Sequence, residues 1–184
     1  MSGRRPAACR IGAAIVAAAA LFAGGCASLS KDECRNADWQ AIGQRDGAAG
    51  ETPDRLAAHA KACAEVGVVP DEARWLQGRE IGLASYCTGR RGREVGARGF
   101  FYRDVCTGPS ELEFRRGYEI GRQIEQLNQL LAGNQGDRRR LLDRLAQKGV
   151  SDEERQQIRL RLIRLDQDAD RLRWSIDSAW RIPL

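Results

Sequence analysis

Hydrophobic side chains recur every three or four residues along the last part of the chain. From residue 158 to residue 179 the steps alternate between four and three, at Ile158, Leu162, Leu165, Ala169, Leu172, Ile176 and Ala179. This heptad stripe on an otherwise charged segment predicts one long amphipathic helix. A second stripe precedes it, at Ile120, Ile124, Leu127, Leu131, Leu141 and Leu145. We expect the segment Gly133-Asn-Gln-Gly136 to interrupt this second helix.

The turn between the two stripes is also marked in the sequence. Lys148-Gly149 is typical of a helix end, and Ser151-Asp-Glu-Glu154 has the pattern of a capping box that begins the next helix. Together these signals predict an antiparallel helical hairpin over residues 109–184. Periodicity leaves a second arrangement open, in which the stripe packs on the domain that precedes it.

Three stretches share an aromatic residue followed by two glycines spaced four residues apart. They are Trp39 with Gly43 and Gly47, Trp75 with Gly78 and Gly82, and Phe114 with Gly117 and Gly121. Glycines at this spacing share a helix face. Because a glycine inside a helix costs about 1 kcal/mol relative to alanine, we interpret the pairs as sites where helix backbones approach closely, with the aromatic residues in the core. In the alternative interpretation the glycines mark turns.

The region before the hairpin is predicted to be a small helical domain, residues 32–108, in a mainly α fold. Pro53 and Pro70 stand where helices are expected to begin. Residues 88–99, between Cys87 and Cys106, are rich in arginine and glycine and predict a basic loop.

The first 25 residues follow the order of a secretory signal. An apolar run over 11–22 comes after three arginines, Arg4, Arg5 and Arg10, and is followed by small residues. The run is shorter than the roughly 20 residues of a membrane-spanning helix. Cys26, directly after two glycines, resembles the processing site of bacterial lipoproteins. The sequence has alanine at position 23, where such sites usually have leucine. The alternative is ordinary signal-peptide cleavage between residues 13 and 20. We predict a lipoprotein signal peptide over 1–25, lipidation of Cys26 and a tether over 26–31.

The net charge changes once the signal is removed. The 184 residues carry 30 basic and 25 acidic side chains, a net charge of +5. Three of the basic residues lie before Cys26, which leaves 27 basic and 25 acidic side chains, a net charge of +2. Such a balanced surface offers no electrostatic footprint for nucleic acid, so we expect no nucleic-acid partner.

The cysteines are interpreted in the same way. Cys9 leaves with the signal and Cys26 takes the lipid. The remaining four are Cys34, Cys63, Cys87 and Cys106. In an exported protein four cysteines predict two disulfides with three possible pairings. Zinc would need closely spaced ligands; His59, four residues before Cys63, is the best candidate, but no second cluster accompanies it. We predict no metal site and no cofactor.

The ordered set of these motifs resembles a family of uncharacterised bacterial lipoproteins known only as a domain of unknown function. The residues that carry the resemblance are Cys26, Trp39, Gly43, Asp46-Gly47, Cys63, Gly78-Arg-x-x-Gly82-Leu83, Tyr86-Cys87, Gly99, Tyr102 and Cys106. It covers about residues 26–122 and leaves out the C-terminal hairpin. The resemblance implies a lipid-anchored envelope protein with paired cysteines, and it implies no activity.

Among the pairings we favour Cys34 with Cys63, clamping the ends of two neighbouring helices, and Cys87 with Cys106, closing the basic loop. The expected protein is lipid-anchored in the cell envelope and facing the periplasm. Ala27, rather than aspartate, follows Cys26, and by resemblance to known sorting this favours the inner leaflet of the outer membrane.

We expect a structural or binding role, with membrane contact through the lipid and an envelope protein partner on the heptad face. The alternative is a periplasmic hydrolase that uses His59 with Glu80 and Glu119, which recur at one position of the glycine pattern. No nucleophile elbow, P-loop or H-E-x-x-H motif supports an enzyme. We expect His59 to be an exposed helix residue and the two glutamates to be solvated.

Overall fold

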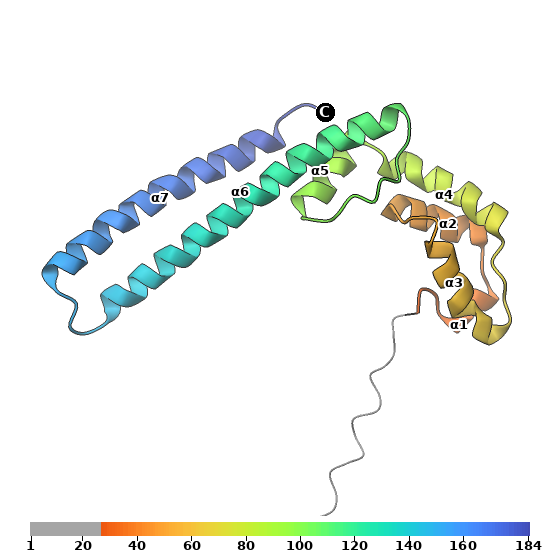
Figure 1. The fold of residues 1–184 in the computed structure, drawn as a ribbon, viewed down its shortest axis with the longest axis horizontal. Coiled ribbons are helices and arrows are strands. Elements are labelled where there is room, and N and C mark those ends of the chain that lie inside the picture. Colours follow the sequence, from red (N-terminus) through yellow and green to blue (C-terminus); the bar gives the residue numbers. More distant parts are fainter. Residues whose placement is uncertain (1–26) are drawn as a thin grey trace, which may run out of the picture.

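The computed structural model describes residues 27–184, and the predicted signal peptide and Cys26 lie outside this range. The described residues are helical and contain no strand. The elements are α1 (Lys31–Arg35), α2 (Trp39–Ala49), α3 (Arg55–Cys63), the 3-10 helix η1 (Ala64–Val66), α4 (Glu72–Tyr86), α5 (Gly89–Ala97), α6 (Pro109–Ala146) and α7 (Asp152–Trp180). The predicted fold, a disulfide-stapled helical domain followed by a long helical hairpin, is confirmed (Figure 1).

Helices α2 and α4 lie side by side with their backbones in direct contact. A Cβ added to Gly43 would come 2.0 Å from the carbonyl oxygen of Trp75, and one added to Gly78 would come 1.9 Å from that of Gln40. No side chain fits at these distances, so glycine is required on both helices. The close-packing interpretation of the glycines is therefore correct, and the turn interpretation is wrong.

Helices α5 and α6 form a second contact of the same kind. A Cβ on Gly92 would come 2.1 Å from the carbonyl oxygen of Phe114, and one on Gly117 would come 1.9 Å from that of Gly89. The prediction of a basic loop over residues 88–99 is wrong because these glycines are interface residues of a helix. Thr88 caps that helix by accepting a hydrogen bond from the backbone N–H of Arg91.

The two helix pairs repeat one another residue by residue. Gly43, Gly47, Gly78 and Gly82 correspond to Gly92, Gly96, Gly117 and Gly121, because each glycine faces the equivalent backbone position of the other pair. In both pairs the helices run in the same direction. Trp75 and Phe114 occupy the same position, and both are 0% exposed. One parallel helix pair is thus built twice, as α2 with α4 and as α5 with α6, and the first pair additionally carries α1, α3 and η1.

Each pair has its own core and its own disulfide. Cys34–Cys63 joins α1 to the end of α3, beneath a core that includes Trp39, Ile42 and Trp75. Both predicted disulfide pairings are confirmed. On the loop-entropy estimate, each bridge stabilises the folded chain by about 3 kcal/mol.

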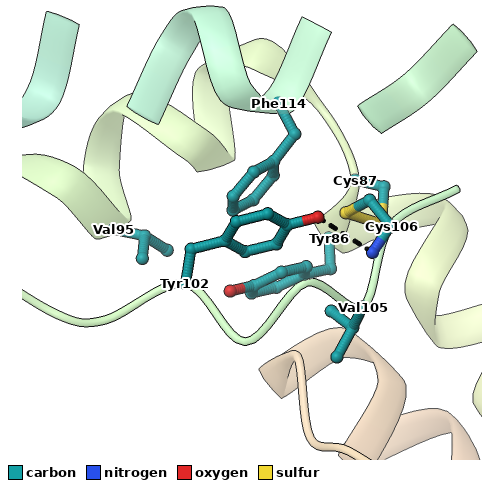
Figure 2. Close-up of a cluster of buried hydrophobic side chains, with 7 residues drawn as sticks. All are labelled: Tyr86, Cys87, Val95, Tyr102, Val105, Cys106 and Phe114. Atoms are coloured by element: carbon teal, nitrogen blue, oxygen red, sulfur yellow. Dashed lines mark hydrogen bonds between the residues drawn. A yellow bond between two sulfur atoms is a disulfide. The ribbon is translucent and has the colours of Figure 1, made fainter. Parts of the chain in front are cut away.

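Figure 2 shows the second core around the disulfide Cys87–Cys106. The Tyr102 ring lies 4.5 Å from that of Phe114 between ring centroids, and its hydroxyl accepts a hydrogen bond from the backbone N–H of Cys106. The buried Tyr86 ring stacks on Phe114 at 5.0 Å. Burial raises the pKa of both tyrosines above its usual range. The segment after α5 is therefore held by aromatic packing as well as by the disulfide.

Side-chain contacts join the first pair to the second. Tyr86, the last residue of α4, stacks on Phe114 of α6, and its ring also lies over Gly50, whose positive φ of 72° places it in the left-handed region that ends α2. Arg103, in the loop before α6, pairs with Glu51. The side chain of Val105 also points toward the first pair in Figure 2.

The hairpin is formed by α6 and α7, which lie antiparallel along their length (Figure 1). Helix α6 continues through Gly133 and Gly136, so the predicted interruption is wrong. Packing on α7 outweighs the propensity cost of two glycines, and Asn134 adds a hydrogen bond from its side-chain amide to the carbonyl oxygen of Leu165 at 3.0 Å. The heptad stripe faces α6, with Ile158, Ala169 and Ala179 buried.

The far end of α7 returns to the second helix pair. Arg93 of α5 donates hydrogen bonds from Nη1 to the carbonyl oxygens of Trp180 and Ile182, each at 2.9 Å. Its guanidinium also lies over the Trp180 ring, 5.4 Å from the centroid. The predicted boundary at residues 108 and 109 falls at the start of α6, whose first part belongs to the glycine contact with α5.

Candidate functional site

A buried aspartate on α2 is the centre of a polar network inside the first helix pair. Asp46 accepts a hydrogen bond from the indole N–H of Trp75 at 2.8 Å. His59 Nε2 lies 2.9 Å from the same oxygen, Asp46 Oδ2. The guanidinium of Arg55 lies 3.9 Å from the other carboxylate oxygen. Asp46 is therefore fixed by three side chains from α3 and α4.

The network continues to the N-terminal segment through His59. The hydroxyl of Ser28 lies 2.9 Å from His59 Nδ1. A carboxylate only accepts hydrogen bonds, so His59 Nε2 donates to Asp46, while the Ser28 hydroxyl is bonded to Nδ1 on the other side of the ring. The hydrogen-bonded order is thus Ser28, His59, Asp46.

Ser28 belongs to a segment that is packed on the domain. The next residue, Leu29, is 5% exposed and lies in the core with Cys34 and Trp39. Ser30 then caps α1 by accepting a hydrogen bond from the backbone N–H of Glu33, whose side chain bonds back to Ser30. From residue 28 onward the predicted tether is therefore part of the fold.

The second helix pair shows that this polar network is not needed to pack the helices. By the residue correspondence of the two pairs, Val95 occupies the position of Asp46. Val95 is buried among apolar and aromatic side chains, beside Phe114. The same parallel helix contact is thus built with valine in one pair and aspartate in the other. What Asp46 adds is its bonds to Trp75 and, through His59, to Ser28.

Residues 38–123 match the sequence model of the family described as Protein of unknown function (DUF2799). This range begins at Asp38, the N-cap of α2, and ends two residues after the last interface glycine, Gly121. The similarity therefore spans both helix pairs and ends before most of the hairpin. Comparison with curated proteins and with solved structures gives no match.

The structure separates the residues of the predicted hydrolase site. His59 is 1% exposed, so the expectation of an exposed helix residue is wrong. Leu56, His59 and Cys63 lie on the inner face of α3, which is why the ring is buried. Glu80 and Glu119 are exposed on α4 and α6, and the hydrogen-bond partners of His59 are Ser28 and Asp46.

Sequence reasoning missed Ser28 and the central place of Asp46. The best sequence signal for this network was the position of His59, one helical turn before Cys63. Because Cys63 was predicted to form a disulfide, a residue on the same helix face is expected to point into the core. Cys63 is bonded to Cys34 and is therefore not free to bind zinc beside His59. Within residues 27–184 no cluster of three or more His, Cys, Asp or Glu side chains could hold a metal ion.

Arg79 extends the polar region toward the contact between the helix pairs. Its Nε donates to the carbonyl oxygen of Glu51 at 2.9 Å, and its guanidinium lies 6.0 Å from the Trp75 ring centroid. Burial lowers the pKa of Arg79, and the charge of Asp46 partly offsets this effect. In the part of the chain that the structure describes, no helix is long and apolar enough to span a bilayer.

Proposed function

We propose that this protein is anchored in the cell envelope by a lipid on Cys26 and has a structural or binding role there. In this proposal it faces the periplasm from the inner leaflet of the outer membrane. The helical hairpin is the part that extends away from the anchored domain toward an envelope protein partner.

The observation that carries the proposal is the packing of the chain immediately after Cys26. Ser28 is bonded to His59 and Leu29 is buried, so Ala27 alone separates the anchor residue from the folded domain. A lipid at Cys26 would hold the domain against the membrane surface. In this setting the Asp46 network has a clear role, because it fixes the segment that bears the anchor.

Two further features support an envelope protein. Both disulfides are well suited to an oxidising compartment. Helix α6 has 38 residues and is continuous from the glycine contact to the hairpin turn. At 1.5 Å per residue it is about 57 Å long. Because this one helix takes part in both the α5–α6 contact and the hairpin, the contact fixes the direction of the hairpin.

The test is acyl labelling of the protein in a bacterial host that processes its signal. Cells grown with an alkyne-bearing fatty acid should yield labelled wild-type protein in the membrane fraction and unlabelled Cys26→Ala protein. Ser28→Ala serves as a matched control that keeps the anchor residue. Label that persists in Cys26→Ala, or absence of label in the wild type, would contradict the proposal. Ala27→Asp should move the labelled protein from outer to inner membrane.

A hydrolase is the second candidate, and the hydrogen-bonded order Ser28, His59, Asp46 favours it. This is the order of nucleophile, base and carboxylate in serine hydrolases, although here the serine lies at Nδ1 and the carboxylate at Nε2. Ser28 is the most accessible of the three, with His59 and Asp46 both buried. A fluorophosphonate probe that labels the wild type but not Ser28→Ala would establish this function. An unlabelled wild type would exclude it.

A further inference from the structure

An uncharged turn lies at the end of the first helix pair where the described chain begins. Residues 66–70 read Val-Gly-Val-Val-Pro; they end η1 and lead to α4. Val66 and Val68 pack against the core that contains Leu29. Val69 instead extends into solvent and is 85% exposed, the highest fraction among the large apolar side chains of the described chain. The most exposed apolar side chain therefore lies on a turn whose neighbouring valines are anchored in the core.

The turn that carries Val69 is held in one conformation by backbone hydrogen bonds. Gly67 has a positive φ of 72°, and its N–H donates to the carbonyl oxygen of Ala64 at 3.1 Å. The N–H of Val68 donates to the carbonyl oxygen of Cys63 at 3.2 Å, and Cys63 is held in turn by its disulfide to α1. These bonds are typical of a helix end closed by glycine. The exposure of Val69 is therefore set by the fold.

The same turn lies beside the segment that would carry the lipid anchor. Lys31 Nζ is 3.0 Å from Glu65 Oε2, so α1 contacts η1, which leads directly into the turn. Figure 1 shows α1 and the C-terminal end of α3 together at the end of the first helix pair that lies away from α5. Ser28 is bonded to His59 of α3, and the two residues from Cys26 to Ser28 span at most about 7 Å. A lipid on Cys26 would hold this end of the domain at the bilayer surface.

We propose that the turn at residues 66–70 is a membrane-contact element, in which Val69 enters the interfacial layer of the bilayer beside the lipid on Cys26. This inference rests on the proposed lipid anchor. The acyl chains supply the attachment, and Val69 fixes which side of the domain faces the membrane. An apolar side chain gains free energy on leaving water, and the short connection to the anchor keeps this one within reach of the bilayer.

The space between the turn and the anchor favours a bilayer over a protein as the occupant. The gap allowed by the connection, about 7 Å, is narrower than the roughly 10 Å diameter of a single helix. The charges at this end also suit the headgroup layer. Lys31 pairs with Glu65 and Arg35 pairs with Asp32, and all four side chains are more than half exposed. These pairs stay hydrated among polar headgroups while Val69 extends from the uncharged turn.

The test is photo-crosslinking of the lipidated full chain in vesicles of phosphatidylethanolamine and phosphatidylglycerol that contain an azide-tagged phospholipid. Benzoylphenylalanine in place of Val69 should form a lipid adduct with a yield several-fold above that of benzoylphenylalanine in place of Phe101. Phe101 is the matched control because it is 81% exposed and follows α5, away from α1 (Figure 1). Equal yields at the two positions, or no lipid adduct at Val69, would overturn the proposal.

Acyl labelling of the same samples separates this inference from the proposed function. A missing acyl label contradicts the anchor itself, whereas labelled protein without a lipid adduct at Val69 contradicts only the membrane contact. In intact cells the same position should also give lipid adducts. A protein adduct in their place would show that a partner covers the turn and would overturn the proposal.

A longer connection tests the role of the anchor directly. Insertion of about ten glycine and serine residues between Ala27 and Ser28 adds roughly 17 Å of reach. The acyl label and the helical circular dichroism should be unchanged, and the yield of the lipid adduct at Val69 should fall several-fold. An unchanged yield would contradict the inference that the short connection places this turn at the bilayer.

Discussion

Substitution of a single interface glycine should separate the effect of close helix packing from that of helix propensity. In Gly78→Ala, the new Cβ would lie 1.9 Å from the carbonyl oxygen of Gln40, and real contacts of this kind do not fall below 3.0 Å. The α2 and α4 backbones must therefore separate by roughly 1 Å, an overpacking that costs about 3 kcal/mol. Alanine returns about 1 kcal/mol of helix propensity. We expect a net loss of about 2 kcal/mol in the free energy of unfolding.

The matched control is Gly133→Ala on α6, where no atom lies within 4 Å of the added Cβ. This change should stabilise the protein by about 1 kcal/mol because only the propensity gain remains. The assay is urea denaturation of the oxidised protein followed by circular dichroism, with both disulfides verified by mass. If Gly78→Ala is as stable as the wild type, or if both alanines stabilise equally, the close-packing explanation is refuted.

Four further predictions follow from single contacts. Asp46→Ala leaves the buried Trp75 N–H and His59 ring without their acceptor and should cost about 3 kcal/mol in thermal or urea unfolding, while Glu80→Ala, at an exposed position, should change little. Replacing Cys87 and Cys106 together by serine should lower the free energy of unfolding by about 3 kcal/mol. An unchanged denaturation midpoint would show that this disulfide does not stabilise the fold. Arg93→Ala removes the bonds to Trp180 and Ile182, so hydrogen exchange should accelerate over residues 180–184 but not in α2 or α4. Burial raises the pKa of Tyr86 and Tyr102 in the folded state. Their contribution to stability is therefore complete below the unfolded tyrosine pKa of about 10 and is lost as pH rises through the folded pKa values. Tyrosinate absorbance should show tyrosines that titrate late, and the Tyr86→Phe protein should have one late-titrating tyrosine fewer than the wild type.

The parts of the fold that could be predicted were those with a strong local or combinatorial signal. The heptad stripe from Ile158 to Ala179 specified α7 because apolar periodicity is read directly from the sequence. The cysteine pairing was also predicted correctly, since the predicted signal and lipid site left four cysteines to consider and each pairs with its neighbour in sequence.

The errors arose where tertiary contacts override local preference. Gly92 and Gly96 suggested a loop because glycine and arginine are frequent there, yet both face the backbone of α6, and the close packing offsets their low helix propensity. Gly133 and Gly136 suggested a break, but the cost of each is small against the packing of α7 along α6. In both cases the decisive interaction is with a residue distant in sequence.

The candidate site was predicted least well. His59 was noticed, but its partners Ser28 and Asp46 are 31 and 13 residues away. No periodicity links these positions, because the fold of α3 across the first helix pair is what brings them together. Only the structure relates Asp46 to Val95, because the correspondence depends on which glycines face which backbone positions in the two helix pairs.

Mass analysis of the N-terminal peptide from protein extracted from the envelope tests lipid anchoring most directly. The peptide should begin at Cys26 and carry the mass of a thioether-linked diacylglyceryl group, with a further acyl chain on its amine, and it should be absent from Cys26→Ala protein. A mature N-terminus at any other residue, or a Cys26 peptide without lipid, would contradict the proposed attachment and with it the role assigned to the packed segment at Ser28 and Leu29.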